Sequence, residues 1–277
     1  MMMNILYCGD DKMAAGLTLS VLSLMDQTQE PLHIYVLTAA ITTEQQQFQP
    51  LADATLIKLN QQLQRRADTS SIIKIDISDL FAAMPPTANL LTSFTPNCML
   101  RLYADQVAAL PARLLYLDTD VLCCRDFSEF YHQDFAGSDL VGVLDHYGRW
   151  FFHQSWTHLD YLNSGVLLLN LQQIRQDGLF AACRQRCAKQ RMFMPDQSAL
   201  NKLTKHKKIA PVIFNEQHQR QEETVFQHFT TSFRFFPWFH TVTIKPWQIT
   251  KVQQQLGLHD YDDLFQCFLT LTAATKK

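Results

Sequence analysis

Residues 114–122 read Leu114-Leu115-Tyr116-Leu117-Asp118-Thr119-Asp120-Val121-Leu122. Apolar and aromatic residues lead into an acidic pair, which predicts a strand buried on both faces. Residues i and i+2 of a strand point to the same side, so the carboxylates of Asp118 and Asp120 should aim in one direction. A divalent cation would relieve their mutual repulsion and could neutralise a diphosphate. The stretch therefore predicts a metal site at a strand end, or else a strand that runs into an ordinary polar turn.

Alternating strand-like and helix-like segments surround this stretch and predict an α/β fold with a doubly wound, mostly parallel sheet. Upstream, we expect strands at residues 4–8, 32–37, 54–59 and 72–77, and helices over residues 13–25 and from Thr42 onward. Downstream, we expect a helix from Met99, a strand at 140–145, a tight turn at 163–165 feeding a buried strand, one helix over 172–191 and a helix start at Pro195. Ligands of such sheets bind beyond the carboxyl ends of the strands.

Asp10 and Asp11 directly follow the first expected strand. They should therefore share one rim of the sheet with the Asp118–Asp120 pair. An ordinary helix start explains Asp10 and Asp11 equally well, because Asp is favoured at helix N-termini.

Other polar residues stand at positions where ligand chemistry and structural roles compete. Arg101 lies among apolar neighbours, where Arg often pairs with a carboxylate or a phosphate. Asp196 opens an expected helix and could simply cap it. The aromatic and His-rich residues 146–160 suit either a loop over a sugar or plain packing. After Val225 the chain again combines aromatic residues with spaced His and basic residues, which could supply a nitrogen ligand and a phosphate contact.

Bulk composition excludes several classes of protein. The chain has 277 residues, 47% of them hydrophobic, and a net charge of -2, which does not favour nucleic-acid binding. Only 8 Gly argue against a glycine-rich phosphate loop, and seven irregularly spaced Cys argue against a disulfide framework or structural zinc. The first residues lack the features of a signal peptide, and no apolar run reaches 18 residues, so we expect a cytoplasmic protein. Leu264, Phe268 and Leu271 fall at helical spacing and should pack on the core, with a partner or membrane surface as the alternative.

Taken together, these motifs resemble those of the retaining glycosyltransferases of family 8, the group of glycogenin and the bacterial lipooligosaccharide galactosyltransferases. The resemblance covers Asn4 to Trp247. It rests on the following motifs in this order: Asp10-Asp11, Arg101 seventeen residues before Asp118, Leu115 to Asp120, Leu162-Asn163-Ser164-Gly165-Val166, Asp196-Gln197, and a late His with Lys245-Pro246-Trp247. Each motif is weak alone, but the ordered set is specific.

The resemblance implies a GT-A fold, a Rossmann-like nucleotide-sugar-binding architecture, over residues 1–250, with a small helical extension at 251–277. It implies Mn²⁺ or Mg²⁺ held by Asp118, Asp120 and a late His. Asp196 and Gln197 match the pair under the donor sugar, with Gln197 near the face that a retaining reaction uses. Positions implied for nucleotide-sugar binding are Cys8, Asp10, Asp11, Arg101, Thr119, Asn163, Ser164 and Lys245. Asp145 matches a donor-site position less securely, because its spacing to Asn163 is short.

One departure from the family pattern leaves two assignments open. The family has a His and, about six residues later, a Lys that leads Pro-Trp. Here His228 and Arg234 have that spacing, but Pro-Trp follows Lys245, only five residues after His240. We expect residues 235–244 to be an inserted hairpin and prefer His228 as the metal ligand over His240. Either Arg234 or Lys245 could contact the diphosphate.

The function implied is metal-dependent transfer of galactose or glucose from a UDP-sugar to a glycan, glycolipid or glycoprotein acceptor, with retention of configuration. Peripheral contact with the inner face of the cell membrane would suit a lipid-linked acceptor. Two alternatives stay open: a non-catalytic sugar-nucleotide-binding protein of the same fold, and a nucleotidyltransferase. The intact Asp118 and Asp120 pair argues against the first. The missing Gly-rich, basic opening after Cys8 argues against the second.

Overall fold

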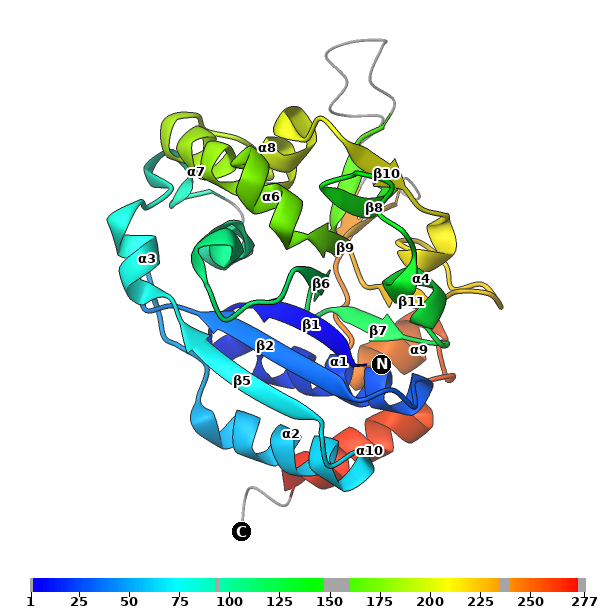
Figure 1. Ribbon diagram of the computed structural model, residues 1–277. Coiled ribbons are helices and arrows are strands. Elements are labelled where there is room, and N and C mark those ends of the chain that lie inside the picture. Colours follow the sequence, from blue (N-terminus) through cyan, green and yellow to red (C-terminus); the bar gives the residue numbers. More distant parts are fainter. Residues whose placement is uncertain (1, 93–94, 147–159, 235–239, 274–277) are drawn as a thin grey trace.

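A seven-stranded sheet forms the centre of the molecule. The computed structural model describes residues 2–92, 95–146, 160–234 and 240–273, with the backbone alone at 232–234 and 240–242. The strand order is β10-β8-β9-β6-β1-β2-β5 (Figure 1). Only β9 runs antiparallel to its neighbours, so the sheet is mostly parallel, as expected. The strands are β1 Met3–Cys8, β2 Leu32–Thr38, β5 Ser71–Asp76, β6 Arg113–Leu117, β8 Leu140–Leu144, β9 Leu162–Asn170 and β10 Lys207–Ile209.

Helices cover both faces of this sheet. The α-helices are α1 Ala14–Gln27, α2 Asp53–Arg66, α3 Ser78–Ala83, α4 Ser128–His132, α6 Leu171–Asp177, α7 Leu179–Lys189, α8 Pro195–Leu203, α9 Ile249–Leu256 and α10 Asp262–Ala273. The 3₁₀ helices are η1 Asp11–Met13, η2 Thr87–Asn89, η3 Pro96–Gln106 and η4 Val212–Phe214. Alternation along β1 separates two cores, because Ile5 and Tyr7 face the α1 side whereas Leu6 faces η3 and α7.

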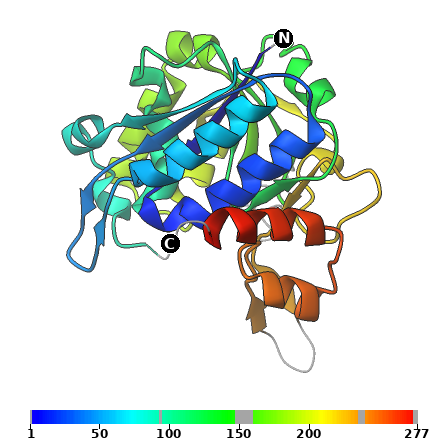
Figure 2. The ribbon, with the colours of Figure 1, turned by 90° about the horizontal axis from the view of Figure 1, so that it is seen from below.

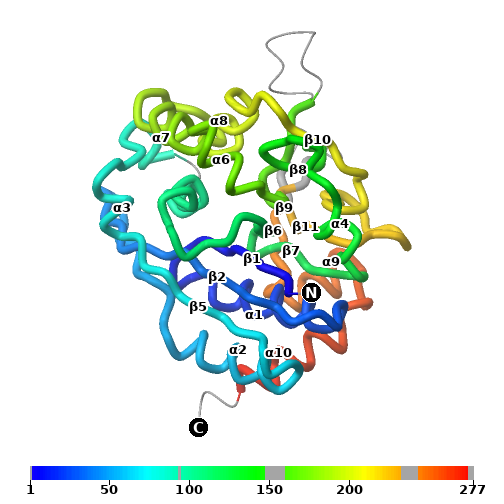
Figure 3. Tube along the Cα trace, in the orientation of Figure 1, coloured from blue at the N-terminus to red at the C-terminus, as the bar shows by residue number. Residues whose placement is uncertain are grey.

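Three helices lie side by side on one face of the sheet. Figure 2 shows α2, α1 and α10 in that arrangement, and α1 contacts both of the others. Leu264 and Phe268 of α10 are buried in the same core as α1, and Leu271 packs against it. The preferred interpretation of these three residues, packing on the core, is therefore confirmed. The chain trace in Figure 3 shows the C-terminal α10 returning to the N-terminal half of the protein.

In the described part of the chain, three short antiparallel strand pairs accompany the central sheet. They are β3 Ile41–Thr42 with β4 Gln47–Phe48, β7 Val121–Cys123 with β11 Phe226–His228, and β12 Ser232–Arg234 with β13 His240–Val242. The β12–β13 pair forms a hairpin at the expected place, but it begins at Ser232 rather than at residue 235, and its connection at 235–239 lies outside the described residues. Most of the aromatic stretch at 146–160 likewise lies outside them.

Two expectations upstream of the acidic pair are wrong. Residues 54–59, expected as a strand, lie inside α2, because Leu56, Leu59 and Leu63 form one buried helical face. The helix expected from Thr42 is replaced by the β3–β4 pair. There the Thr43 hydroxyl donates to the Gln46 carbonyl and accepts from the Gln46 N–H, which closes a turn rather than capping a helix.

Two further corrections concern the downstream segments. Asn163, Ser164 and Gly165 are not a turn but part of β9. The single helix expected over 172–191 is two helices, α6 and α7, because Gly178 adopts a left-handed conformation with φ of 66° between them. Across the described residues, no helix has the length and apolar character needed to cross a bilayer.

Candidate functional site

Asp118 and Asp120 lie in a turn beyond the carboxyl end of β6. The Val121 N–H donates to the Asp118 carbonyl at 3.1 Å and closes the turn. β11 pairs with β7 so that His228 stands opposite Val121. Its Nε2 lies 3.3 Å from Asp120 Oδ1 and 3.9 Å from Asp118 Oδ2. The two carboxylates therefore converge as expected, but through a turn rather than through the side-chain alternation of a strand.

The outer oxygen of each carboxylate is already held by the protein. Asp118 Oδ1 accepts hydrogen bonds from Arg101 at 2.9 Å and from the Tyr116 hydroxyl. Asp120 Oδ2 accepts one from the Lys245 ammonium group, which also donates to the Phe229 carbonyl. The inner oxygens, Asp118 Oδ2 and Asp120 Oδ1, face the imidazole.

These inner oxygens and His228 Nε2 fit a divalent cation. One ligand atom from each of Asp118, Asp120 and His228 lies within 4.8 Å of the others. Two carboxylate oxygens with one imidazole nitrogen form a donor set that suits Mn²⁺ or Mg²⁺. Among the residues whose side chains are described, this is the one such group of three.

The Lys245 ammonium group and the His228 ring keep Asp120 ionised. Burial raises the pKa of a carboxyl, but here Lys245 and His228 more than offset burial and hold the pKa of Asp120 well below its usual value. A permanently ionised carboxylate is the form that ligates metal. Burial raises the pKa of Tyr116 well above its ordinary value against the opposing effect of Arg101, so the phenol stays protonated as a donor to Asp118.

Arg101 joins the acidic turn to a second acidic residue. It is 3% exposed, and its guanidinium lies over the Tyr116 ring at 3.9 Å. Its Nε lies 3.3 Å from Asp196 Oδ2, and it also donates to the backbone carbonyls of Cys98 and Ser164. The expectation that Arg101 pairs with a carboxylate is confirmed. Each of its three guanidinium nitrogens has a partner, and the Tyr116 ring covers the planar group.

Asp196 and Gln197 open α8 and point into a buried polar network. The Ser164 N–H donates to Gln197 Oε1 at 3.0 Å, and the Ser164 hydroxyl contacts both residues. Gln197 Nε2 donates to Asp145 Oδ2 at 3.0 Å, and Asn163 Nδ2 donates to the same oxygen at 2.9 Å. Asp145, the least secure match, is thus central to this network.

The family model described as glycosyl transferase family 8 matches residues 4–250. The chain belongs to glycosyltransferase family 8. No curated protein sequence matches it.

Solved structures support the same fold. The galactosyltransferase LgtC, in complex with donor and acceptor sugar analogs, is 19% identical with a TM-score of 0.68, over 98% of this chain and 96% of LgtC. The apo form of the glycosyltransferase GlyE from Streptococcus pneumoniae TIGR4 is 16% identical with a TM-score of 0.63, over 98% of this chain and 64% of GlyE. Mouse xyloside xylosyltransferase 1, in its apo form, is 15% identical with a TM-score of 0.59, over 82% of this chain and 97% of that one. These likenesses show that the family 8 chain has a GT-A fold.

The loop after β1 lies at the same rim as the acidic turn. Asp10 caps η1 by accepting from the Lys12 N–H, as the helix-start interpretation anticipates. The carboxylate of Asp11 instead accepts from the Ala52 N–H. Burial raises the pKa of Cys8 although Arg101 opposes this, so Cys8 presents a neutral thiol. A role of this loop in holding uridine stays a prediction.

The Lys-Pro-Trp motif places Lys245 against the acidic turn. A Cβ added to Gly16 would lie 2.7 Å from Trp247 and 2.8 Å from the Thr119 carbonyl oxygen, so α1, the turn and Trp247 meet at this glycine. Lys245 is thereby fixed beside Asp120. The side chains of Arg234 and His240, the alternatives left open by the sequence, lie outside the described part. The structure describes the side chains of Lys245 and His228, and both lie beside Asp120.

Asn215 belongs to the site, although sequence reasoning missed it. It is fully buried and bonds both Asn163 and His228. The only sequence signal was a polar run, 215–219, directly after apolar residues.

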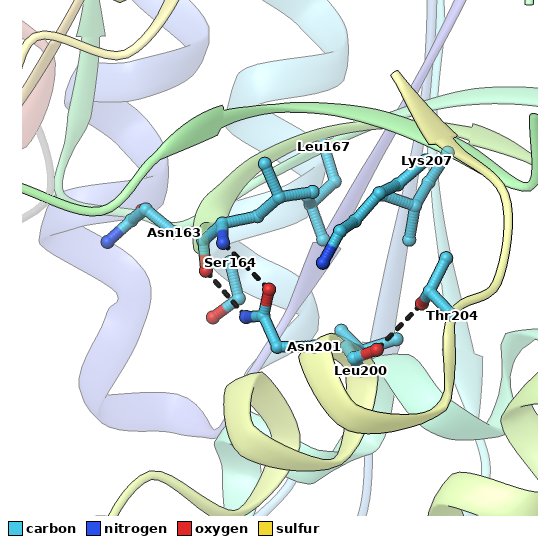
Figure 4. Close-up of a pocket in the computed structure, with 9 residues that line it drawn as sticks. Asn163, Ser164, Leu167, Leu200, Asn201, Thr204 and Lys207 are labelled. Atoms are coloured by element: carbon cyan, nitrogen blue, oxygen red, sulfur yellow. Dashed lines mark hydrogen bonds between the residues drawn. The ribbon is translucent and has the colours of Figure 1, made fainter. Parts of the chain in front are cut away.

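Two cavities flank the network. One of about 170 Å³ is bordered by Asp145, His146, Glu216 and Gln217 over apolar side chains. The other, about 10 Å³, lies between β9 and α8, where Asn201 exchanges two hydrogen bonds with the Leu162 backbone (Figure 4). Only the first has room for part of a sugar.

Proposed function

We propose that the protein transfers a hexose, galactose or glucose, from a UDP-sugar to a hydroxyl group of a glycan, glycolipid or protein acceptor, with retention of anomeric configuration. The observation that carries this proposal is the joining of two clusters. Asp118, Asp120 and His228 form a cation site, and Arg101 connects it directly to Asp196 and the Gln197 network. A diphosphate at the first cluster would place its sugar toward the second.

The protein's own residues divide the work of binding the donor. Asp118, Asp120 and His228 would hold Mn²⁺ or Mg²⁺, which supplies positive charge to neutralise the departing diphosphate. Lys245 donates to Asp120 and is partly exposed, so its ammonium group can contact a phosphate oxygen beside the metal. Arg101 pairs with both Asp118 and Asp196, and its proposed role is therefore to position these carboxylates rather than to contact substrate.

Retention is proposed to follow front-side attack. Gln197 is a neutral amide whose oxygen accepts from Ser164 and whose nitrogen donates to Asp145. An amide held in this way is a poor nucleophile but can stabilise positive charge that develops on the sugar ring. Asp196 is ion-paired to Arg101, which lowers its nucleophilicity. The donor phosphate then accepts the proton of the acceptor hydroxyl.

The decisive experiment measures UDP release from a panel of UDP-sugars with Mn²⁺ or with a chelator. We expect metal-dependent release with one hexose and no pyrophosphate release. Asp120→Asn should abolish turnover, and the matched control Asp68→Asn, at an exposed position, should retain it. Pyrophosphate release would indicate a nucleotidyltransferase, and nucleotide-sugar binding without turnover would indicate a binding protein. Full activity of Asp120→Asn under chelation would overturn the proposal.

A further inference from the structure

A continuous chain of hydrogen bonds runs from the β9 backbone to the imidazole of His228. The Gly165 N–H donates to Asn163 Oδ1 at 2.9 Å, and Asn215 Nδ2 lies 2.9 Å from the same oxygen. Asn215 Oδ1 then lies 3.2 Å from His228 Nδ1. Asn163, Asn215 and His228 are all buried, so solvent does not compete for these bonds.

The direction of the chain is fixed at its start. A backbone N–H can only donate, so the atom of Asn163 that faces Gly165 must be its oxygen. The opposite end of that amide is then the NH₂ group, and it meets a natural acceptor, the Asp145 carboxylate, at 2.9 Å. Both contacts of Asn163 agree on one orientation of its side chain.

The orientation of the Asn163 side chain determines the orientation of the Asn215 amide and, through it, the tautomer of His228. Because Asn163 offers an oxygen, Asn215 must present its NH₂ group to it and its own oxygen to His228. An oxygen facing Nδ1 requires a proton on Nδ1. A neutral imidazole with the proton there carries its lone pair on Nε2, the atom that faces Asp118 and Asp120.

We propose that Asn215 is a positioning residue that fixes His228 in the Nδ1–H tautomer, so that the Nε2 lone pair is presented to the cation. Through Asn163, the same residue couples the cation site to the network around Gln197. This inference rests on the proposed metal-binding role of His228. Outer partners of this kind typically change metal affinity about 10–100-fold when removed.

The first test is the Mn²⁺ affinity of the metal-free protein, measured by electron paramagnetic resonance titration. Asn215→Ala should bind Mn²⁺ about 10–100-fold more weakly than the wild type. Asn215→Asp loses the donor to Asn163 Oδ1 but keeps an oxygen that accepts from Nδ1–H, so it should bind Mn²⁺ more tightly than Asn215→Ala. Asn89→Ala is the matched control, since Asn89 is also fully buried but its side chain bonds backbone atoms of residues 187–192. It should leave Mn²⁺ affinity unchanged.

The second test does not depend on metal. Nitrogen-15 spectra of the neutral His228 ring should show the Nδ1–H tautomer in the wild type and in Asn215→Asp, and a loss of that preference in Asn215→Ala. An Nε2–H ring in the wild type would overturn the inference, as would wild-type Mn²⁺ affinity in Asn215→Ala. If the wild type binds no Mn²⁺ at all, the metal-binding role of His228 falls, and this inference with it.

Discussion

Gly165→Ala should damage the cation site although it adds a single methyl group. A Cβ at this position would lie 2.1 Å from Cε1 of His228, 2.7 Å from Nδ1 and 2.9 Å from Nε2. Its φ lies outside the left-handed region, so alanine fits the β9 backbone, and the three nearest atoms that its methyl group would meet all belong to the His228 ring. The glycine is thus needed for the close approach of the imidazole.

The size of the effect follows from the contact distance. Carbon atoms pack comfortably at about 3.5 Å, so the ring must retreat by about 1.4 Å. Metal–ligand distances tolerate about 0.2 Å, which means that Nε2 would leave the coordination position. We expect a loss of Mn²⁺ affinity of at least about tenfold. Overpacking should also lower the free energy of unfolding by about 1–3 kcal/mol.

The assay pairs Mn²⁺ titration with kcat/KM from UDP release. Gly142→Ala in β8 is the matched control, because its Cβ would meet only the side-chain atoms of Leu167 and Leu162. It should lose stability and keep Mn²⁺ affinity. In a His228→Ala background, Gly165→Ala should cost no further affinity, since the ring is gone. Wild-type Mn²⁺ affinity in Gly165→Ala would refute the reasoning.

Three other predictions follow from the same contacts. Arg101→Lys cannot span Asp118, Asp196 and two backbone carbonyls, so kcat/KM should fall on the order of 10²-fold. The control is Arg184→Lys, at a buried Arg that pairs with Asp105 and donates to the Leu102 carbonyl rather than to Asp118 or Asp196; it should lose stability but keep turnover. Equal turnover in both variants would contradict the assignment. Lys245→Met should raise the pKa of Asp120. That pKa is depressed in the folded protein, so ionised Asp120 stabilises the fold above its unfolded pKa of about 3.9, and this stabilisation is lost as pH falls. The acid-unfolding midpoint of Lys245→Met under chelation should therefore move to higher pH. The midpoint of the control variant, the exposed Lys251→Met, should not move. An unchanged midpoint would show that Lys245 does not control this carboxyl. Phe265→Ala in α10 should lower the free energy of unfolding by about 3–5 kcal/mol in urea titrations; a loss below 1 kcal/mol would mean that α10 is not part of the core.

The acidic pair shows what local pattern could and could not predict. Its position at the end of a buried strand follows from the apolar run before it. The prediction that the two carboxylates converge was right, but the reason given for it was wrong, because the backbone turns at Thr119 instead of continuing as a strand. Turn geometry depends on the pairing of β7 with β11, about a hundred residues away in sequence, and local periodicity does not report such pairing.

Non-local contacts also explain the other differences. Gly165 suggested a turn because a glycine usually signals backbone freedom, whereas here it admits the His228 ring. The polar run at 215–219 does not single out Asn215, since its two partners come from β9 and β11. Residues 54–59 were short and apolar enough to suit either a strand or a helix, and burial against the sheet decided for the helix.

The most direct test of the account is a crystal structure with Mn²⁺ and UDP bound, with manganese located by anomalous scattering. We predict an anomalous peak between Asp118 Oδ2, Asp120 Oδ1 and His228 Nε2, with the UDP diphosphate on its open side and the Lys245 ammonium group on a phosphate oxygen. A bound UDP with manganese elsewhere, or with these three side chains turned away from the ion, would contradict it.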